Sequence, residues 1–181
     1  MASARTVVGR WAADHQVETV YLALGSNLGD RAANLRRARA ALAPDFTIVA
    51  VSPIYETEPA YVLEQPRFYN QVLQASTSLT PLEALRHLKG IEADLGRTTG
   101  VRFGPRVIDL DLLLYGTAQM DTPELTLPHP RLAERPFVLV PLADIAPNLM
   151  HPSLRTTIGE LRDRLGDTQS AIWRAQAEAN R

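Results

Sequence analysis

The fold of this chain is decided by residues 102–115, which read RFGPRVIDLDLLLY. The Gly-Pro pair at 104–105 is typical of a tight turn, and the β-branched and aliphatic run at 107–115 predicts a strand directly after it. Side chains alternate between the two faces of a strand. The alternation predicts an apolar face of Ile108, Leu110, Leu112 and Leu114 and an opposite face of Asp109, Asp111 and Leu113. The apolar face commits this strand to a core, and the two carboxylates lie together on the other side.

The two carboxylates, Asp109 and Asp111, have Cα atoms roughly 6.5 Å apart at about 3.3 Å rise per residue. Oxygen ligands held this close suit a hard cation such as Mg²⁺, which prefers carboxylate and phosphate oxygens. Arg102 and Arg106 stand just upstream, where they can receive the anion that such a metal carries. An Asp-x-Asp pair alone is also typical of a solvated strand face. Together with the arginines and the Gly-Pro turn, the pair favours a site for a metal and a phosphate.

The composition limits the classes of protein that the chain can belong to. Its 181 residues, with 45% hydrophobic and 22% charged side chains, indicate one ordinary globular domain. A net charge of -1 argues against a nucleic-acid or anionic-membrane partner. The absence of cysteine excludes disulfides, thiol nucleophiles and cysteine-based zinc sites. No apolar stretch approaches the ~20 residues of a membrane span and no signal-peptide pattern follows Met1, so we expect a cytoplasmic protein.

The position of the single lysine excludes proteins with a Walker-type phosphate loop. Lys89 is the only lysine in the chain, and it does not follow a glycine. A Walker-type phosphate loop needs a Gly-Lys-Ser/Thr sequence, so this loop is absent. Phosphates bound by this protein must therefore be held by arginines, backbone amides and metal.

Strand and helix patterns alternate along the chain. We expect strands at about 18–24, 46–52, 68–78 and 107–115, and helices at about 30–42, 80–96, 136–145 and 157–165. Asp30 is the expected N-cap of the first helix, and the sequence Thr80-Pro81-x-Glu83 predicts a capping box at the second. Residues 56–67 read as a long loop that is a candidate for function.

This order of elements, β-α-β-β-α-β, predicts the α+β class. We expect a ferredoxin-like sandwich: a mostly antiparallel sheet with helices packed on one side, and a C-terminal helical extension. The domain then covers residues 18–166, with an N-terminal extension at 1–17 and a tail at 167–181.

Five motifs in the order of a known family occur between Val20 and Pro147. They are ALGSNLG (23–29), YETEP (55–59), FYN (68–70), RFGPRVIDLD (102–111) and LPHPRxxxRxF (127–137). In these motifs the chain resembles the 6-hydroxymethyl-7,8-dihydropterin pyrophosphokinases of folate biosynthesis. The resemblance implies a ferredoxin-like fold, two Mg²⁺ ions, and the substrates ATP and 6-hydroxymethyl-7,8-dihydropterin. It also implies AMP and the pterin pyrophosphate as products, and we expect a monomer.

The resemblance also assigns roles to residues. It implies metal ligands at Asp109 and Asp111, and catalytic arginines at Arg97, Arg102 and Arg106. It implies ATP contacts at Leu85, Glu92, Arg102, Leu112, Thr126, His129 and Arg135. It implies pterin contacts at Thr57, Phe68, Asn70, Asp109 and Phe137. Phe68 and Asn70 are two apart on one expected strand and so face the same way, and a ring with an amide suits a flat heterocycle.

Departures from the family pattern and competing classes are also visible. The loop at 97–102 is one residue shorter than in familiar members, and Lys89 and Glu124 replace a glutamine and an arginine near the nucleotide; these changes predict an altered ATP affinity.

An RNA-binding ferredoxin-like module is one alternative, although only 6% of residues are aromatic. A nucleotidyltransferase is another, although its Gly-Ser and Asp-x-Asp motifs lie close together in sequence. An inactive relative that serves as a binding partner is the third.

Overall fold

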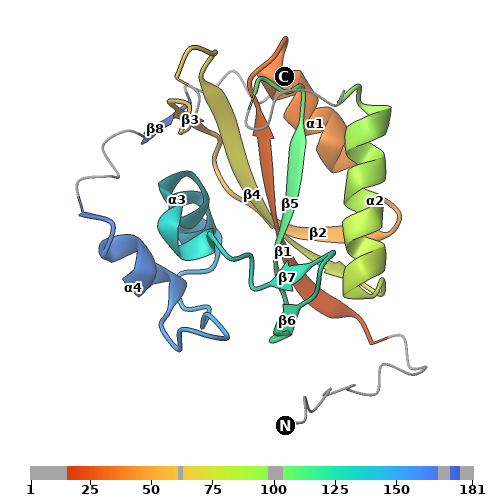
Figure 1. The fold of residues 1–181 in the computed structure, drawn as a ribbon, viewed down its shortest axis with the longest axis vertical. Coiled ribbons are helices and arrows are strands. Elements are labelled where there is room, and N and C mark those ends of the chain that lie inside the picture. The colour runs from red at the N-terminus through yellow and green to blue at the C-terminus, as the bar shows by residue number, and fades with distance from the viewer. Residues whose placement is uncertain (1–15, 61–62, 98–103, 167–171, 176–181) are drawn as a thin grey trace, which may run out of the picture.

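The computed structural model describes residues 16–60, 63–97, 104–166 and 172–175 (Figure 1). Its strands are β1 (Glu18–Ser26), β2 (Phe46–Val51), β3 (Tyr55–Thr57), β4 (Phe68–Thr77), β5 (Asp109–Tyr115), β6 (Met120–Asp121), β7 (Thr126–Leu127) and β8 (Ile172–Arg174). Its helices are α1 (Arg31–Ala41), α2 (Pro81–Asp94), the short 3₁₀ helix η1 (Leu132–Glu134), α3 (Pro136–Ile145) and α4 (Ile158–Asp163). No described helix has the length and apolar character needed to cross a membrane.

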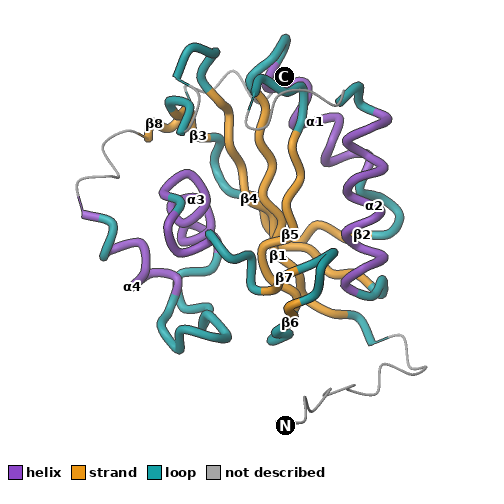
Figure 2. Tube along the Cα trace, in the orientation of Figure 1, coloured by secondary structure: helices purple, strands orange, loops and turns teal. Residues whose placement is uncertain are grey.

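The main sheet has the strand order β5-β1-β4-β3-β8, and β2 also pairs with β4 (Figure 2). Every pairing in it is antiparallel. β2 and β3 pair with successive parts of β4, so they occupy the same edge of that strand. β1 lies between β4 and β5, which brings Gly25 beside both Asn70 and Asp109. The functional residues of three strands therefore meet at one end of the sheet.

Local sequence signals begin and end the first two helices as expected. Asp30 caps α1 by accepting from the Ala33 N–H at 2.8 Å. Thr80 and Glu83 form the predicted capping box of α2, and Gly96 follows its end with φ +92°, a conformation that favours glycine. These helix boundaries are set by residues that are close together in the sequence.

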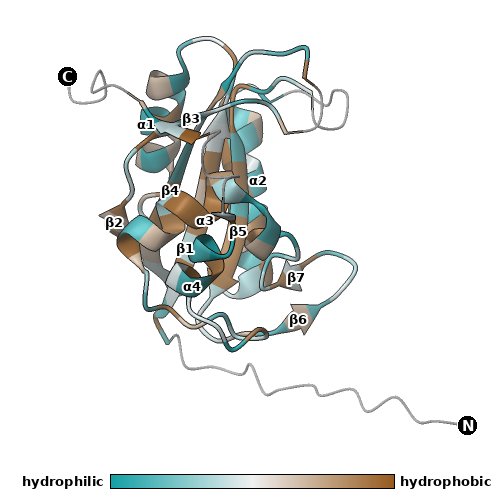
Figure 3. Ribbon diagram, turned by 90° about the vertical axis from the view of Figure 1, so that its left-hand side faces the viewer, coloured by the Kyte–Doolittle hydropathy of each residue, from teal (hydrophilic) through white to brown (hydrophobic). Residues whose placement is uncertain are grey.

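Helices cover both faces of the sheet. α1 and α2 pack on one face over Leu22, Leu24 and Leu110, as predicted for the ferredoxin-like unit. The C-terminal helices α3 and α4 build a second apolar cluster on the opposite face, around Val72 and Leu139. Figure 3 shows the apolar residues gathered on the central strands and on α3. The expected C-terminal extension is thus the second layer of the core.

The predicted face of Leu114 is wrong. Leu22 pairs with Leu112 whereas Tyr21 pairs with Leu114, so the register shifts at Leu113. This β-bulge places one extra residue in β5 and turns the following side chain over. Leu113 and Leu114 both join the cluster beneath α3, while Leu112 packs in the other cluster with Ile108 and Leu110. Alternation before the bulge is as predicted, and the two aspartates keep their shared face.

Two short strands of the main sheet, and the small β6-β7 pair beside it, are missing from the sequence prediction. Residues 55–57, which overlap the start of the loop expected at 56–67, form β3 between β4 and β8. β8 lies in the segment that we expected to be a tail. Three residues are too few to show an alternation pattern, and both strands depend on partners that are distant in the sequence.

Burial of His151 predicts a pH dependence of stability. Its side chain is buried and Nδ1 accepts from the N–H groups of Ser153 and Leu154 at 3.3 and 3.2 Å. Burial lowers the pKa of His151 below its usual 6.5, so the unfolded chain binds this proton at a higher pH than the folded chain. The contribution of neutral His151 to the free energy of unfolding is therefore fully present above pH 6.5, and it is lost as the pH falls below this value. We expect His151→Asn, which keeps an acceptor, to give a shallower fall in urea unfolding free energy between pH 7 and 5.

Candidate active site

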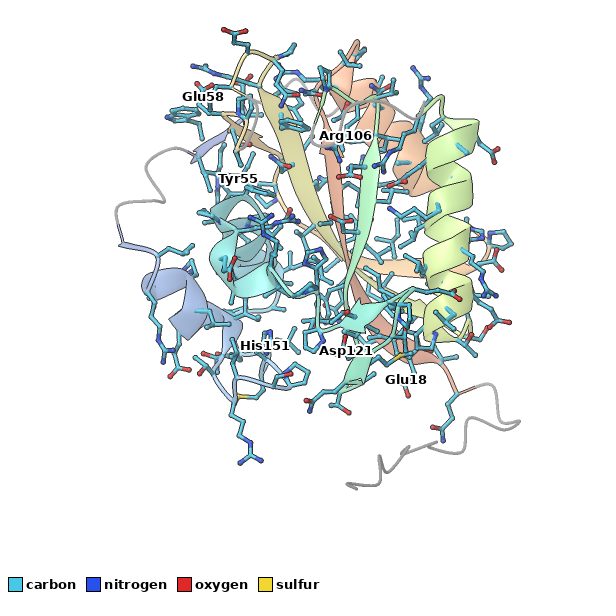
Figure 4. The ribbon with its side chains drawn as sticks, viewed as in Figure 1. Glu18, Tyr55, Glu58, Arg106, Asp121 and His151 are labelled. Atoms are coloured by element: carbon cyan, nitrogen blue, oxygen red, sulfur yellow. The ribbon has the colours of Figure 1, made fainter. Side chains whose placement is uncertain are left out.

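A cleft of about 250 Å³ opens where β1, β3, β4 and β5 meet α3. Figure 4 shows Arg106 and Glu58 at this end of the sheet. The predicted site residues that line the cleft are Thr57, Phe68, Asn70, Arg97, Arg106, Asp109, Asp111, His129, Arg135 and Phe137. Four predicted ATP contacts do not line it: Leu85, Glu92, Leu112 and Thr126. Arg102 lies outside the described residues.

Two arginines neutralise Asp109. Arg97 Nη1 lies 2.6 Å from Asp109 Oδ1, and Arg106 Nη1 lies 2.7 Å from Asp109 Oδ2. Asp111 has a looser partner, Arg135, at 3.7 Å. The Nε atom of Arg135 is buried without a hydrogen-bond partner among the described residues. This end of the cleft therefore combines carboxylates with guanidinium groups, which are strong donors to bound anions.

Glu92 supports this cluster from beneath the strand. Its side chain is almost fully buried and accepts from the Leu110 N–H at 2.6 Å and from Lys89 Nζ at 2.9 Å. Its other oxygen lies 2.5 Å from Arg97 Nη1. Burial raises the pKa of Glu92, while Lys89 and the Leu110 N–H lower it. Glu92 is thus a buried support for Arg97, and its predicted contact with the nucleotide stays a prediction.

His129 lines the cleft on the side of Asp111. Its backbone N–H donates to the Leu113 carbonyl at 2.8 Å, which fixes its loop beside β5. Its Nδ1 accepts from the Arg131 N–H at 3.2 Å, so the neutral ring carries its proton on Nε2. Burial lowers the pKa of His129, and Asp111 opposes this. A neutral histidine with a free Nε2–H is a donor suited to a phosphate or carbonyl oxygen.

Across β1 from Asp109, the cleft is lined by an aromatic ring and an amide. Phe68 and Asn70 both line the cleft, which confirms that they face the same way. Asn70 Nδ2 donates to the buried Thr57 Oγ1 at 2.7 Å, so the amide is oriented by β3. Phe137, at the start of α3, lines the same cleft. A Cβ atom at Gly25 would lie 3.3 Å from Asn70 Oδ1, so glycine leaves room for the Asn70 amide in the cleft.

Sequence reasoning missed Asn27. It is buried, and its Oδ1 accepts from the Arg106 N–H at 2.8 Å. Its Nδ2 donates to Gln65 Oε1 and to the Pro66 carbonyl, both at 3.0 Å. Asn27 therefore joins the loop before β4 to the loop before β5, and these two loops flank the cleft. The sequence signal for Asn27 was its place in the ALGSNLG motif (23–29), and a motif does not reveal partners that are distant in the chain.

We expect Asn27→Ala to lower the free energy of unfolding by about 1–2 kcal/mol, because buried groups on both loops lose their partners. Urea denaturation measures this loss. Asn34→Ala, on α1, is a comparison that removes a buried amide without breaking the link between the loops. The link is unimportant if hydrogen exchange at Arg106 and Gln65 is the same in Asn27→Ala as in the wild type.

The carboxylates fit a magnesium site that the substrate completes. No cluster of three or more histidine, aspartate or glutamate side chains able to hold a metal occurs in the described part of the chain. Mg²⁺ is commonly held by one or two carboxylates together with substrate phosphates. Asp109 and Asp111 supply two carboxylates from one strand face, both partly exposed to the cleft. The donor set therefore suits Mg²⁺ bound with a polyphosphate.

Comparison with known proteins identifies the family. Residues 21–147 match the family model of the 7,8-dihydro-6-hydroxymethylpterin-pyrophosphokinases (HPPK). The chain belongs to the HPPK family. An HPPK relative named 2-amino-4-hydroxy-6-hydroxymethyldihydropteridine pyrophosphokinase, from Pseudomonas aeruginosa, is 44% identical over 141 residues, covering 77% of this chain and 87% of the relative. The protein of the same name from Bacillus subtilis is 49% identical and covers 69% and 76%.

Other HPPK relatives are much longer than this chain. The folic acid synthesis protein FOL1 of Dictyostelium discoideum is 45% identical over 79% of this chain, which spans only 22% of it. The crystal structure of Plasmodium falciparum HPPK-DHPS with pterin and p-hydrobenzoate has a TM-score of 0.70 at 16% identity. It covers 90% of this chain, which spans 48% of that protein. These neighbours share the HPPK fold.

These matches confirm the predicted family, the α+β ferredoxin-like fold and the enzyme class. HPPK enzymes carry out pyrophosphoryl transfer in folate biosynthesis, the reaction predicted from the motifs. The RNA-binding and nucleotidyltransferase alternatives are not favoured.

Proposed function

We propose that this chain transfers the pyrophosphoryl group of ATP to the hydroxymethyl oxygen of 6-hydroxymethyl-7,8-dihydropterin. The observation that carries the proposal is one cleft with two chemically different ends. Carboxylates and arginines line one end, and an aromatic ring and an oriented amide line the other. The first suits a metal-bound polyphosphate and the second a flat heterocycle rich in donors and acceptors.

In the proposed reaction the alcohol oxygen attacks the β-phosphorus of ATP. A new bond forms between them, the bond from the β-phosphorus to the oxygen of the α-phosphate breaks, and AMP leaves. The hydroxyl proton is released as the oxygen bonds to phosphorus. Reactions of this kind require alignment of the two reactants and neutralisation of the developing charge rather than a covalent contribution from the protein.

The arginines supply neutralising charge in the proposal. Arg97 and Arg106 now pair with Asp109, and each presents a planar group that binds phosphate oxygens in bidentate fashion. Glu92 holds Arg97 from the side of α2, so this guanidinium is positioned before the substrate arrives. Arg102 is proposed to act with them.

Asp109 and Asp111 are the proposed ligands of two Mg²⁺ ions that bind with ATP. When bound, these ions would neutralise and orient the phosphate oxygens. His129 and Arg135 are proposed to contact the nucleotide, since both line the cleft beside Asp111. The proposed ATP contacts of Leu85, Glu92, Leu112 and Thr126 lie outside this lining.

Thr57, Phe68, Asn70 and Phe137 are the proposed pterin contacts, together with Asp109. Phe68 and Phe137 offer ring faces for stacking, and Asn70 offers amide groups to the pterin edge. From the composition we also propose a cytoplasmic monomer whose partners are small molecules. The boundaries proposed for its domain, 18–166, leave out β8, which pairs with the same sheet.

Product analysis tests the proposed function. We expect the full-length chain to release AMP from ATP in amounts equal to the pterin consumed, and only with Mg²⁺ and 6-hydroxymethyl-7,8-dihydropterin present. Release of pyrophosphate in place of AMP would indicate nucleotidyl transfer. Absence of both products would show that this chain is an inactive relative.

A further inference from the structure

The C-terminal strand β8 lies beyond the part of the chain that matches the family, which ends at residue 147. It nevertheless extends the sheet that carries the site, by pairing antiparallel with β3. Ile172 lies opposite Thr57, and Arg174 lies opposite Tyr55. Figure 1 shows β8 beside β3 at the edge of the sheet. β3 is thereby an interior strand, although it has only three residues.

Backbone pairing is the main contact of β8. Directly after the strand, the Ala175 N–H donates to the Ile54 carbonyl at 2.9 Å. Arg174 adds a hydrogen bond from Nε to Tyr55 Oη at 3.2 Å and an ion pair with Asp144 at 3.5 Å. Because the Arg174 side chain is 66% exposed, this ion pair adds little to stability.

A second contact connects β8 to the wall of the cleft. The guanidinium of Arg67 lies 5.1 Å from the ring centre of Trp173. The same guanidinium forms an ion pair with Glu58 at 2.6 Å, and Glu58 lines the cleft. β8 therefore pairs with β3 and is connected, through Arg67, to Glu58, the residue that follows β3.

The residues of β3 orient the amide end of the cleft. Thr57 is buried and its hydroxyl accepts from Asn70 at 2.7 Å. A shift of β3 would move this hydroxyl and release the amide from its fixed orientation. β3 pairs with β4 over only three residues, so pairing with β8 on its other edge adds to how firmly Thr57 is held.

We propose that β8 is a positioning element for the pterin end of the active site. By pairing with the free edge of β3 it holds Thr57, and through Thr57 the Asn70 amide, in place before the pterin binds. Such preorganisation strengthens binding because less conformational freedom is lost in the complex. The proposal rests on the proposed function for the identity of the ligand. It predicts an effect on pterin binding and none on ATP binding, since the carboxylate end lies on β5.

The test compares Ala175→Pro with Ala175→Ser in the full-length chain. Proline removes the N–H that donates to Ile54, and serine keeps it. Arg174→Glu is the second variant: it leaves the backbone intact and places a carboxylate beside Asp144. Calorimetry measures pterin binding in the presence of Mg²⁺ and a non-hydrolysable ATP analogue, and binding of the ATP analogue alone. Steady-state kinetics give KM for the pterin separately from kcat.

We expect Ala175→Pro to raise the Kd and KM for the pterin by about threefold to tenfold. Arg174→Glu should raise them less, and Ala175→Ser should leave them unchanged. The Kd of the ATP analogue and kcat should stay within about twofold of the wild type in all three. The proposal is wrong if both Ala175→Pro and Arg174→Glu keep the wild-type pterin Kd, or if ATP binding weakens by the same factor. Failure of the proposed function would instead appear in the wild type, as a lack of AMP release.

Discussion

Replacing Asp111 by alanine is expected to lower turnover by at least about a thousandfold, because the phosphates lose a metal ligand where charge must be neutralised. Asp109→Ala should have an effect of similar size. Asp111→Asn keeps the shape and removes the charge, and should be nearly as inactive. The measurement is AMP release at saturating ATP and pterin over a series of Mg²⁺ concentrations.

The fold should survive the Asp111 substitutions. Asp111 is partly exposed and its nearest cation, Arg135, is 3.7 Å away, so little stability is lost with the carboxylate. Asp163→Ala is the control, since Asp163 is an exposed aspartate on α4, away from the cleft. Near-wild-type turnover of Asp111→Ala at high Mg²⁺ would show that the metal lies elsewhere.

Replacing Asn70 by alanine is expected to weaken pterin binding by about tenfold to a hundredfold. An oriented amide matches groups on the ligand edge, and each group left unpaired costs about 1–3 kcal/mol. Phe68→Ala should have a comparable effect through loss of stacking, whereas Phe68→Tyr keeps the ring and should have little. Calorimetry on the ternary complex with a non-hydrolysable ATP analogue measures these constants.

The control for the Asn70 substitution is Gln74→Ala, a partly exposed amide on the same strand outside the cleft lining. Binding of the ATP analogue alone should be unchanged in both variants. If Asn70→Ala binds the pterin as tightly as the wild type, the amide only ties β4 to Thr57 and the pterin lies elsewhere in the cleft.

The ion pairs around Asp109 relate the geometry of the cleft to the proposed reaction. Without substrate, Arg97 and Arg106 balance a carboxylate that would otherwise be partly buried without a partner. A metal cation bound at Asp109 would neutralise this carboxylate in place of the two arginines. Both guanidinium groups would then be available to phosphate oxygens. The same residues can therefore serve the stability of the free protein and the binding of ATP.

The sequence by itself determined the elements whose signals are local. The capping box of Thr80 and Glu83 needs only neighbouring residues, and two-residue alternation placed Asp109 with Asp111 and Phe68 with Asn70. The motifs added the family and most of the residues that line the cleft. These predictions hold because period and capping depend on distances of a few residues.

The tertiary structure alone decided the contacts between distant segments. The bulge at Leu113 arises from pairing with β1, and it turned Leu114 to the face opposite the predicted one. β3 is a strand because it lies between β4 and β8, and β8 is a strand because it lies beside β3. Asn27 joins two loops, and Glu92 is a buried support because β5 covers it. Each depends on which segments become neighbours on folding, and that is settled by packing across the whole sheet rather than by the residues adjacent in the chain.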